Sequence, residues 1–131
     1  MSRLQLAAIG ISVAGIAISI YLTVLHYAGV VPACVTSGPV NCEAVLSSPY
    51  AVIAGSSIPT SALGIVWFGA SAVLWAQPRG WIQLAWSTVG LVTVLYLVYI
   101  EIVLVGAICL WCTGAHVLVV ALLLIAVSSR R

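Results

Sequence analysis

Four long apolar runs constrain the fold of this chain more than any other feature of its sequence. They cover residues 4–28 and, approximately, 60–77, 81–105 and 107–127. A helix of about 20 apolar residues crosses the roughly 30 Å hydrocarbon core of a bilayer. Each run is therefore predicted to form a membrane-spanning helix. The first run is also too long to be the apolar core of a cleaved signal peptide.

The composition agrees with a lipid environment. Of 131 residues, 64% are hydrophobic and 5% are charged, and the mean hydropathy is +1.30. A soluble domain of this size carries far more charge on its surface. The net charge of +2 is also too small and too dispersed for a nucleic-acid-binding surface. We expect one all-α integral membrane domain over residues 1–131, a four-helix bundle in the lipid bilayer that binds no nucleic acid.

Prolines and arginines fix the expected topology. All five prolines lie between the apolar runs or at their edges, where a missing backbone donor does least harm. With four helices, all four arginines fall on one side of the membrane: Arg3, Arg79, Arg130 and Arg131. The positive-inside rule makes that side cytoplasmic. Both termini are then cytoplasmic, and the long loop 29–59 and the short joint at Gly106 face outward.

The outer loop is predicted to form a cap with short helical segments. Asn41 is a suitable N-cap for a turn through NCEAVL, with Glu43 near the positive end of that turn. Ser48 and Pro49 form a typical N-cap and N1 pair for a second short segment, SPYAVIAG.

The four cysteines all fall on the outer side, where disulfides persist. Cys34 and Cys42 lie in the loop, and Cys109 and Cys112 lie at the outer end of the fourth helix. Thiol–disulfide exchange needs one reachable sulfur and one resolving sulfur. A Cys-x-x-C at a helix start supplies both, and the helix N-terminus lowers the thiol pKa. Cys112 lies one turn deeper, within reach of a lipid-soluble two-electron acceptor such as a quinone.

Three simpler interpretations remain open at this point. The loop pair is explained by one structural disulfide, and the helix pair by inert buried cysteines. Four thiolates also match a zinc site by count, but nothing in the sequence supplies a second shell, so we predict no metal. Only a relay between two pairs accounts for all four cysteines together.

The order of these features resembles the vitamin K epoxide reductase family, in particular its prokaryotic members. Seven residues separate the loop cysteines, Ser48 follows the second by six positions, and a Cys-x-x-C opens the fourth helix. The phrases NCEAVLSSPYA and YLVYIEIVLVGAICLWC carry the likeness. In the unrelated membrane oxidase DsbB, the Cys-x-x-C comes first and the widely spaced pair second, which is the reverse of the order in this sequence.

This resemblance implies an oxidoreductase of a prokaryotic plasma membrane that supports disulfide bond formation. Cys34 is expected to exchange with a separate thioredoxin-like (DsbA-like) partner, and Cys42 to pass the electrons to Cys109. Cys112 then delivers them to a quinone of the ubiquinone, menaquinone or vitamin K type. Ser48 is expected to support the reactive thiols.

The resemblance also suggests a quinone pocket. His116 follows Cys112 by four residues on the same helical face. Vertebrate relatives have a tyrosine there, and either side chain can hydrogen-bond a quinone oxygen. Thr60 and Ser61 match roughly where relatives have a polar quinone contact, and Trp111 and Glu101 are assigned to the same pocket.

Glu101 allows two interpretations and supports one alternative function. Quinone reduction consumes two protons, so Glu101 is a candidate for the proton path; alternatively it is hydrated or hydrogen-bonded near the outer interface. A small four-helix proton-coupled exporter that uses Glu101 is the alternative from another functional class. A non-catalytic scaffold with a stapled loop is a third.

Overall fold

The computed structural model describes residues 2–30, 40–41, 44–45, 48–49, 52, 58–77 and 80–129. Within these ranges the chain forms four long helices: α1 (Arg3–Ala28), α3 (Thr60–Ala76), α4 (Trp81–Tyr99) and α5 (Leu110–Ser128). Helix α4 continues directly into the π-helical segment η2 (Ile100–Val105). The all-α four-helix membrane bundle expected from the sequence is confirmed.

Three of these segments are long and apolar enough to cross a membrane. They are α1 with 26 residues, the continuous α4–η2 segment with 25 and α5 with 19. Helix α3 has 17 residues, which is about the lower limit for a spanning helix. The bundle is therefore thinnest along α3.

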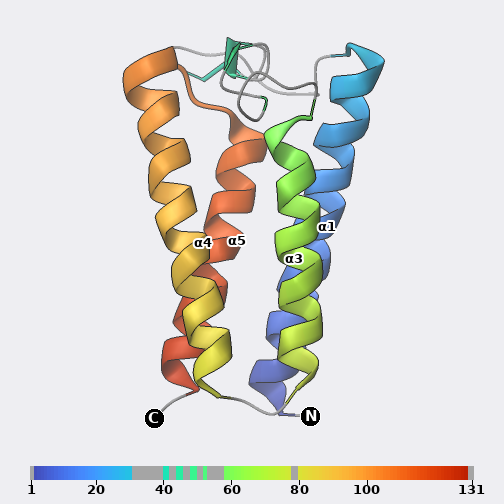
Figure 1. Ribbon diagram of the computed structural model, residues 1–131, viewed down its shortest axis with the longest axis vertical. Coiled ribbons are helices and arrows are strands. Elements are labelled where there is room, and N and C mark those ends of the chain that lie inside the picture. Colours follow the sequence, from blue (N-terminus) through green and yellow to red (C-terminus); the bar gives the residue numbers. More distant parts are fainter. Residues whose placement is uncertain are drawn as a thin grey trace.

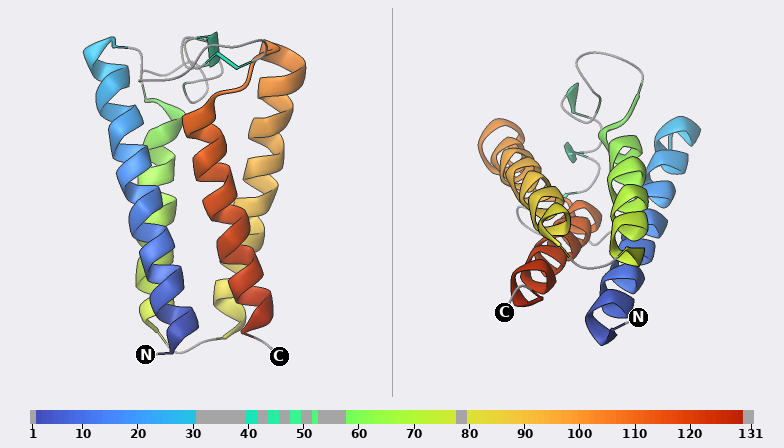
Figure 2. Two further views of the ribbon diagram at one scale, coloured as in Figure 1. Left: turned by 180° about the vertical axis from the view of Figure 1, so that it is seen from behind. Right: turned by 60° about the horizontal axis from the view of Figure 1, so that its bottom comes forward.

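The helices are arranged as two pairs, which contact each other through α1 and α5 and through α3 and α4. Helix α1 lies along α3, α4 lies along α5, and α1 also contacts α5, as Figures 1 and 2 show. The chain begins and ends at the same end of the bundle (Figure 1). The described residues of the loop between α1 and α3, and the turn between η2 and α5, lie at the opposite end.

The helices bury several polar side chains beside an apolar core that contains Phe68, Trp75 and Leu122, and they expose many large apolar side chains. Five of the buried residues carry an uncharged polar side chain: Ser12, Ser19, Ser71, Gln83 and Ser87. The exposed positions include many large aliphatic residues on all four helices, such as Val13, Val66, Val89 and Leu124. A surface of this kind is stable in lipid rather than in water.

Close packing of α1 on α3 depends on small residues of α1. A Cβ atom at Gly15 would overlap the ring of Phe68, which is 3% exposed. One turn earlier, the hydroxyl groups of Ser12 and Ser71 are hydrogen-bonded, with 3.2 Å between their oxygens. Such small residues let two helix backbones approach closely, which is the main source of helix association in a bilayer.

Two glutamines hold the helix ends together at the end of the bundle where the chain begins. The Gln5 amide donates to the carbonyl oxygens of Trp75 and Gln77, at 3.3 and 3.0 Å. The Gln83 amide donates to the carbonyl of Leu74 at 2.8 Å and accepts from the backbone N–H of Gly80 at 2.9 Å. These side chains satisfy backbone groups that a helix end leaves without intrahelical partners.

The joint at Gly106 differs in one respect from the sequence prediction. Gly106 ends η2 in the left-handed region, at φ 76°, as a glycine readily does. The fourth helix, expected from about residue 107, begins only at Leu110. Residues 107–109 leave the helical path because Ile108 pairs with the outer cap instead.

The α1–α3 contact makes a stability prediction with an internal control. Gly15→Ala is expected to lower the free energy of unfolding in detergent by about 1–3 kcal/mol, because the added methyl group overlaps the Phe68 ring. Gly10→Ala lies on the same helix with nothing within 4 Å of the added Cβ, and should leave stability unchanged or slightly higher. Equal thermal or denaturant midpoints for the two variants would contradict the packing described above.

Candidate functional site

Cys109 is fully buried at the start of α5. It is the N-cap residue, with extended backbone angles, and its sulfur accepts a hydrogen bond from the backbone N–H of Cys112 at 3.4 Å. The Cys112 thiol also donates to the Cys109 sulfur. This bond lowers the pKa of Cys109, which lies one residue before the membrane-spanning part of α5. The main cause is therefore the neighbouring thiol rather than the helix dipole alone.

Cys112 lies one turn further into α5 and faces a cavity inside the bundle. Both cysteines are free thiols in this structure. Cys109 is 0% exposed, whereas Cys112 is partly exposed. Within the helix pair, Cys112 is consequently the sulfur that a molecule in the cavity can reach.

The cap contacts the residues that lead into this pair. Val40 forms a parallel bridge with Ile108, and the backbone N–H of Asn41 donates to the Ile108 carbonyl at 2.9 Å. The predicted cap at Asn41 is confirmed, because its side-chain oxygen accepts from the N–H of Ala44 at 3.0 Å. Val45 packs on Ala107 and Cys109, forming a small apolar cluster over the cysteine pair.

Two of the four predicted catalytic cysteines lie outside the described residues, namely Cys34 and Cys42. Ser48 is described, and it lines the outer part of the cavity. Its hydroxyl donates to the carbonyl of Val45 at 2.7 Å. The hydroxyl thus closes the preceding turn by donating. The expected N-cap role involves the backbone N–H groups of residues 50 and 51, which lie outside the described residues.

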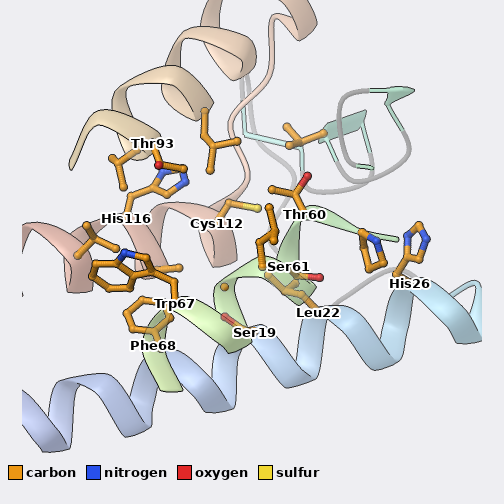
Figure 3. Close-up of a pocket in the computed structure, with 18 of the residues that line it drawn as sticks. Ser19, Leu22, His26, Thr60, Ser61, Trp67, Phe68, Thr93, Cys112 and His116 are labelled. Atoms are coloured by element: carbon orange, nitrogen blue, oxygen red, sulfur yellow. The ribbon is translucent and has the colours of Figure 1, made fainter. Parts of the chain in front are cut away.

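The cavity has a volume of about 780 Å³, and all four helices contribute to its walls. Its walls are largely apolar, with a few polar side chains among them. Figure 3 shows the sulfur of Cys112 directed into this space, on the side where Thr60 lies. An apolar cavity with a few polar groups is typical of a site for a small apolar ligand.

His116 and Trp67 provide polar atoms deeper in the cavity (Figure 3). His116 is 9% exposed, and no described residue hydrogen-bonds to its ring. The indole N–H of Trp67 is buried and has no partner among the described residues. The Trp67 ring stacks on that of Trp86 with 5.8 Å between ring centroids, which connects α3 to α4 across the cavity floor. Unsatisfied buried donors are rare, and a bound ligand commonly explains them.

The predicted polar contacts Thr60 and Ser61 both line the cavity where α3 begins. The oxygens of Ser61 and Thr23 lie 2.9 Å apart, and the Thr23 hydroxyl also donates to the Ser19 carbonyl at 2.7 Å. Since the single hydroxyl proton of Thr23 goes to Ser19, Ser61 donates to Thr23. Ser61 can therefore only accept a hydrogen bond from a ligand.

Trp111 does not belong to the cavity wall. Its ring packs against Tyr21 of α1, with 4.8 Å between ring centroids, and it also contacts the apolar cluster under Val45. The physical reason is the helical period, because a residue adjacent to Cys112 points about 100° away from it. The assignment of Trp111 to the quinone pocket is therefore not supported.

Glu101 lies near the end of the α4–η2 segment that is adjacent to Cys109, and it is 5% exposed. It lines the cavity, and its carboxylate accepts from the backbone N–H of Cys109 at 3.4 Å. Glu101 is thus hydrogen-bonded, but it is buried in protein rather than hydrated at the interface. Among the described residues there is no cluster of three or more His, Cys, Asp or Glu side chains that could hold a metal ion.

Aromatic and polar residues of α3 and α4 were not singled out by the sequence. Trp67, Trp86 and Thr93 all line the cavity. A tryptophan within an apolar helix is ordinary, and no spacing rule marks these three positions. The one hint in the sequence is Gly90, because a glycine within an apolar helix can mark a close contact. In the structure, a Cβ at Gly90 would overlap the Trp67 ring.

Comparison with known proteins identifies the family. The family model described as the vitamin K epoxide reductase family matches residues 6–127, nearly the whole chain. A search among curated proteins finds no significant match to the chain. The family match implies an oxidoreductase of the membrane whose redox chemistry is related to disulfides and uses a quinone or vitamin K as substrate. With its four-helix bundle and a Cys-x-x-C beside an apolar cavity, this chain belongs to the vitamin K epoxide reductase family.

Proposed function

We propose that this protein oxidises a separate thioredoxin-like protein and reduces a membrane quinone, thereby generating disulfide bonds. Electrons pass from the partner to Cys34, then to Cys42, Cys109 and Cys112, and finally to the quinone. The observation that carries the proposal is the position of the helix pair, since Cys112 opens into an apolar cavity while Cys109 contacts the cap.

Each exchange step conserves atoms and electrons. The partner's thiolate attacks the Cys34–Cys42 disulfide at Cys34, and resolution of the mixed disulfide releases the oxidised partner and leaves two loop thiols. The Cys42 thiolate then attacks Cys109 of a Cys109–Cys112 disulfide. Closure of the Cys34–Cys42 disulfide frees both helix thiols. These thiols are oxidised again by the quinone, which takes up two electrons and two protons.

The pairing of the cap with residue 108 supports the step between the two pairs. Asn41 is hydrogen-bonded to Ile108 at 2.9 Å. Cys42 follows Asn41 directly in the sequence, just as Cys109 follows Ile108. The cap is thus bonded to the residue that precedes Cys109, which is the contact that an exchange between the loop pair and the helix pair needs.

The quinone ring is proposed to lie beside Cys112, with its oxygens near His116 and Trp67. Both side chains lack a described hydrogen-bond partner on the cavity side, and a quinone carbonyl accepts hydrogen bonds. Thr60 and Ser61 line the outer part of the same cavity, and Ser48 lies near the cap. The apolar walls suit a ubiquinone, a menaquinone or a vitamin K type ring equally well.

The end of the bundle that carries Cys109 is proposed to lie on the extracytoplasmic side of a prokaryotic plasma membrane. Arg3 lies at the end opposite Cys109, and the positive-inside rule favours a cytoplasmic position for arginines. An exporter that uses Glu101 receives less support. The carboxylate of Glu101 is bonded to the N–H of Cys109 at the outer end of the bundle, away from mid-membrane.

The relay and its order are tested by quinone reduction with purified protein. Cys112→Ala is expected to abolish turnover with every electron donor, because no sulfur then faces the quinone. Cys34→Ala should abolish turnover with a reduced thioredoxin-like protein but retain it with a small dithiol, after subtraction of the protein-free rate. Equal, negligible rates in the wild type and both variants, all folded and tried with several quinones, would refute the proposed function.

The step between the pairs has its own test. In the double variant Cys34→Ala/Cys112→Ala, only Cys42 and Cys109 remain, and mild oxidation is expected to join them in an intramolecular disulfide that mass spectrometry of unreduced peptides detects. The matched control Cys42→Ala/Cys112→Ala leaves Cys34 and Cys109. If the control forms its disulfide as readily, the proposed order of electron transfer is wrong.

His116 is predicted to contribute one hydrogen bond to the quinone. His116→Leu should raise the quinone KM about tenfold, the equivalent of about 1.4 kcal/mol. His116→Gln keeps a hydrogen-bond donor and an acceptor, so its quinone KM should lie between those of the wild type and His116→Leu. A quinone KM in His116→Leu equal to that of the wild type would place the ring elsewhere in the cavity.

A further inference from the structure

Glu101 occupies a position that the electron relay itself does not explain. Its side chain is 5% exposed within a membrane-spanning segment, where an ionisable group is costly and usually has a function. It lines the same cavity as Cys112 and His116. A glutamine would supply the same hydrogen-bond acceptor at lower cost, so the acid calls for a further explanation.

The carboxyl group of Glu101 lies beside Cys109 and on the wall of the cavity. One carboxylate oxygen accepts from the backbone N–H of Cys109 at 3.4 Å. The other accepts no hydrogen bond from any described residue. The Cys109 sulfur is in turn bonded to Cys112. The carboxyl group is therefore a direct neighbour of the residue that must lose a proton when the disulfide forms.

No described cation fixes the charge of this carboxyl group. Glu101 forms no ion pair with a described residue, and Arg3, the described arginine, lies at the opposite end of the bundle. The other described titratable side chains on the cavity wall are Cys112, His116 and His26. His116 lies one turn beyond Cys112, on the side away from Cys109. Among these groups, Glu101 alone contacts Cys109 from another element.

Oxidation of the helix thiols by a quinone needs a group that accepts the proton of the Cys109 thiol. Two S–H bonds break, one S–S bond forms between Cys109 and Cys112, and two electrons pass to the quinone. Two O–H bonds form on the resulting quinol. Both protons come from the thiols, and the Cys109 sulfur is fully buried, so its proton needs a carrier to the quinone oxygen.

We propose that Glu101 is this carrier: its carboxylate takes the proton of the Cys109 thiol as the disulfide forms and passes it to the quinone. Glu101 ends the reaction in its starting state, so no further reactant is consumed. This inference rests on the proposed function, because it presupposes that a quinone in the cavity oxidises the helix pair.

The first test measures one turnover of quinone reduction by the pre-reduced protein in a stopped-flow spectrometer. Glu101→Gln keeps the oxygen that accepts from Cys109 but cannot carry a proton. It is expected to slow the turnover by about 100-fold or more, within the usual range for acid–base groups. Exchange between the loop cysteines and a thioredoxin-like protein should proceed at the wild-type rate. An unchanged turnover in a folded Glu101→Gln protein would overturn the proposal.

A second test follows the protonation of the Glu101 carboxyl group by infrared spectroscopy. Its main measurement is made on the wild type, so it does not depend on whether a slow variant folds. The chain has two acidic side chains, Glu43 and Glu101, so carboxyl bands in infrared spectra are few. A time-resolved spectrum, recorded while a quinone oxidises the pre-reduced wild type, is expected to contain a transient carboxylic acid C=O band, because Glu101 holds the proton only between the two transfers. Glu43→Gln, the matched control, should retain this band, and Glu101→Gln should lose it. A wild-type spectrum without the band, or a band lost in Glu43→Gln instead, would contradict the proposal.

The outcomes separate this inference from the function on which it rests. If the proposed function fails, the wild type itself reduces no quinone. If only the role of Glu101 fails, the wild type and Glu101→Gln reduce quinone at the same rate.

Discussion

The break in helical hydrogen bonding between η2 and α5 is the constraint on which the rest of the site depends. Backbone groups that leave a helix at membrane depth need partners from the protein, because lipid supplies none. Glu101 meets much of this need: its carbonyl accepts from Gly106 and Ala107 at 2.8 and 3.0 Å, and its carboxylate accepts from Cys109. Asn41 of the cap satisfies the carbonyl of Ile108. The groups that satisfy this turn also set the position of the two cysteines.

The cavity follows from the way in which the two helix pairs meet. Small residues such as Gly15 bring α1 against α3, and α4 packs along α5. Between α3 and α4, the stacked rings of Trp67 and Trp86 keep the backbones apart. A space of about 780 Å³ beside Cys112 is within the size range of small-molecule sites in proteins.

Much of the fold could be predicted because hydropathy and proline positions are local features of the sequence, and they mark helices without any knowledge of tertiary contacts. They gave the four helices, and the glycine at position 106 marked the joint between the last two. The cap at Asn41 was also predictable, because an N-cap is a local interaction. The start of α5 at Leu110 was not, because it depends on a contact between Ile108 and the cap, which are far apart in sequence.

The direction in which each helix faces could be predicted far less well. A helix that is apolar all round carries little information on which side is buried, and this is why the aromatic floor formed by Trp67 and Trp86 was missed. Polar residues were better guides. His116 was placed in the pocket from its spacing to Cys112, and the structure brings both to one cavity. Trp111, which was assigned to the same pocket, packs against Tyr21 and is not among the residues that line this cavity.

Burial of the helix pair gives a physical reason for a second, separate pair of cysteines. Cys109 is fully buried under Val45, and Cys112 opens only into a cavity with largely apolar walls. A folded partner protein cannot bring its own sulfur into either position, whereas a flat, apolar quinone fits such a cavity. Under the proposed function, the sulfurs that meet the protein and the sulfur that meets the quinone must therefore be different. The cap then carries electrons between two surroundings, one aqueous and one apolar, that no single cysteine pair could face at once.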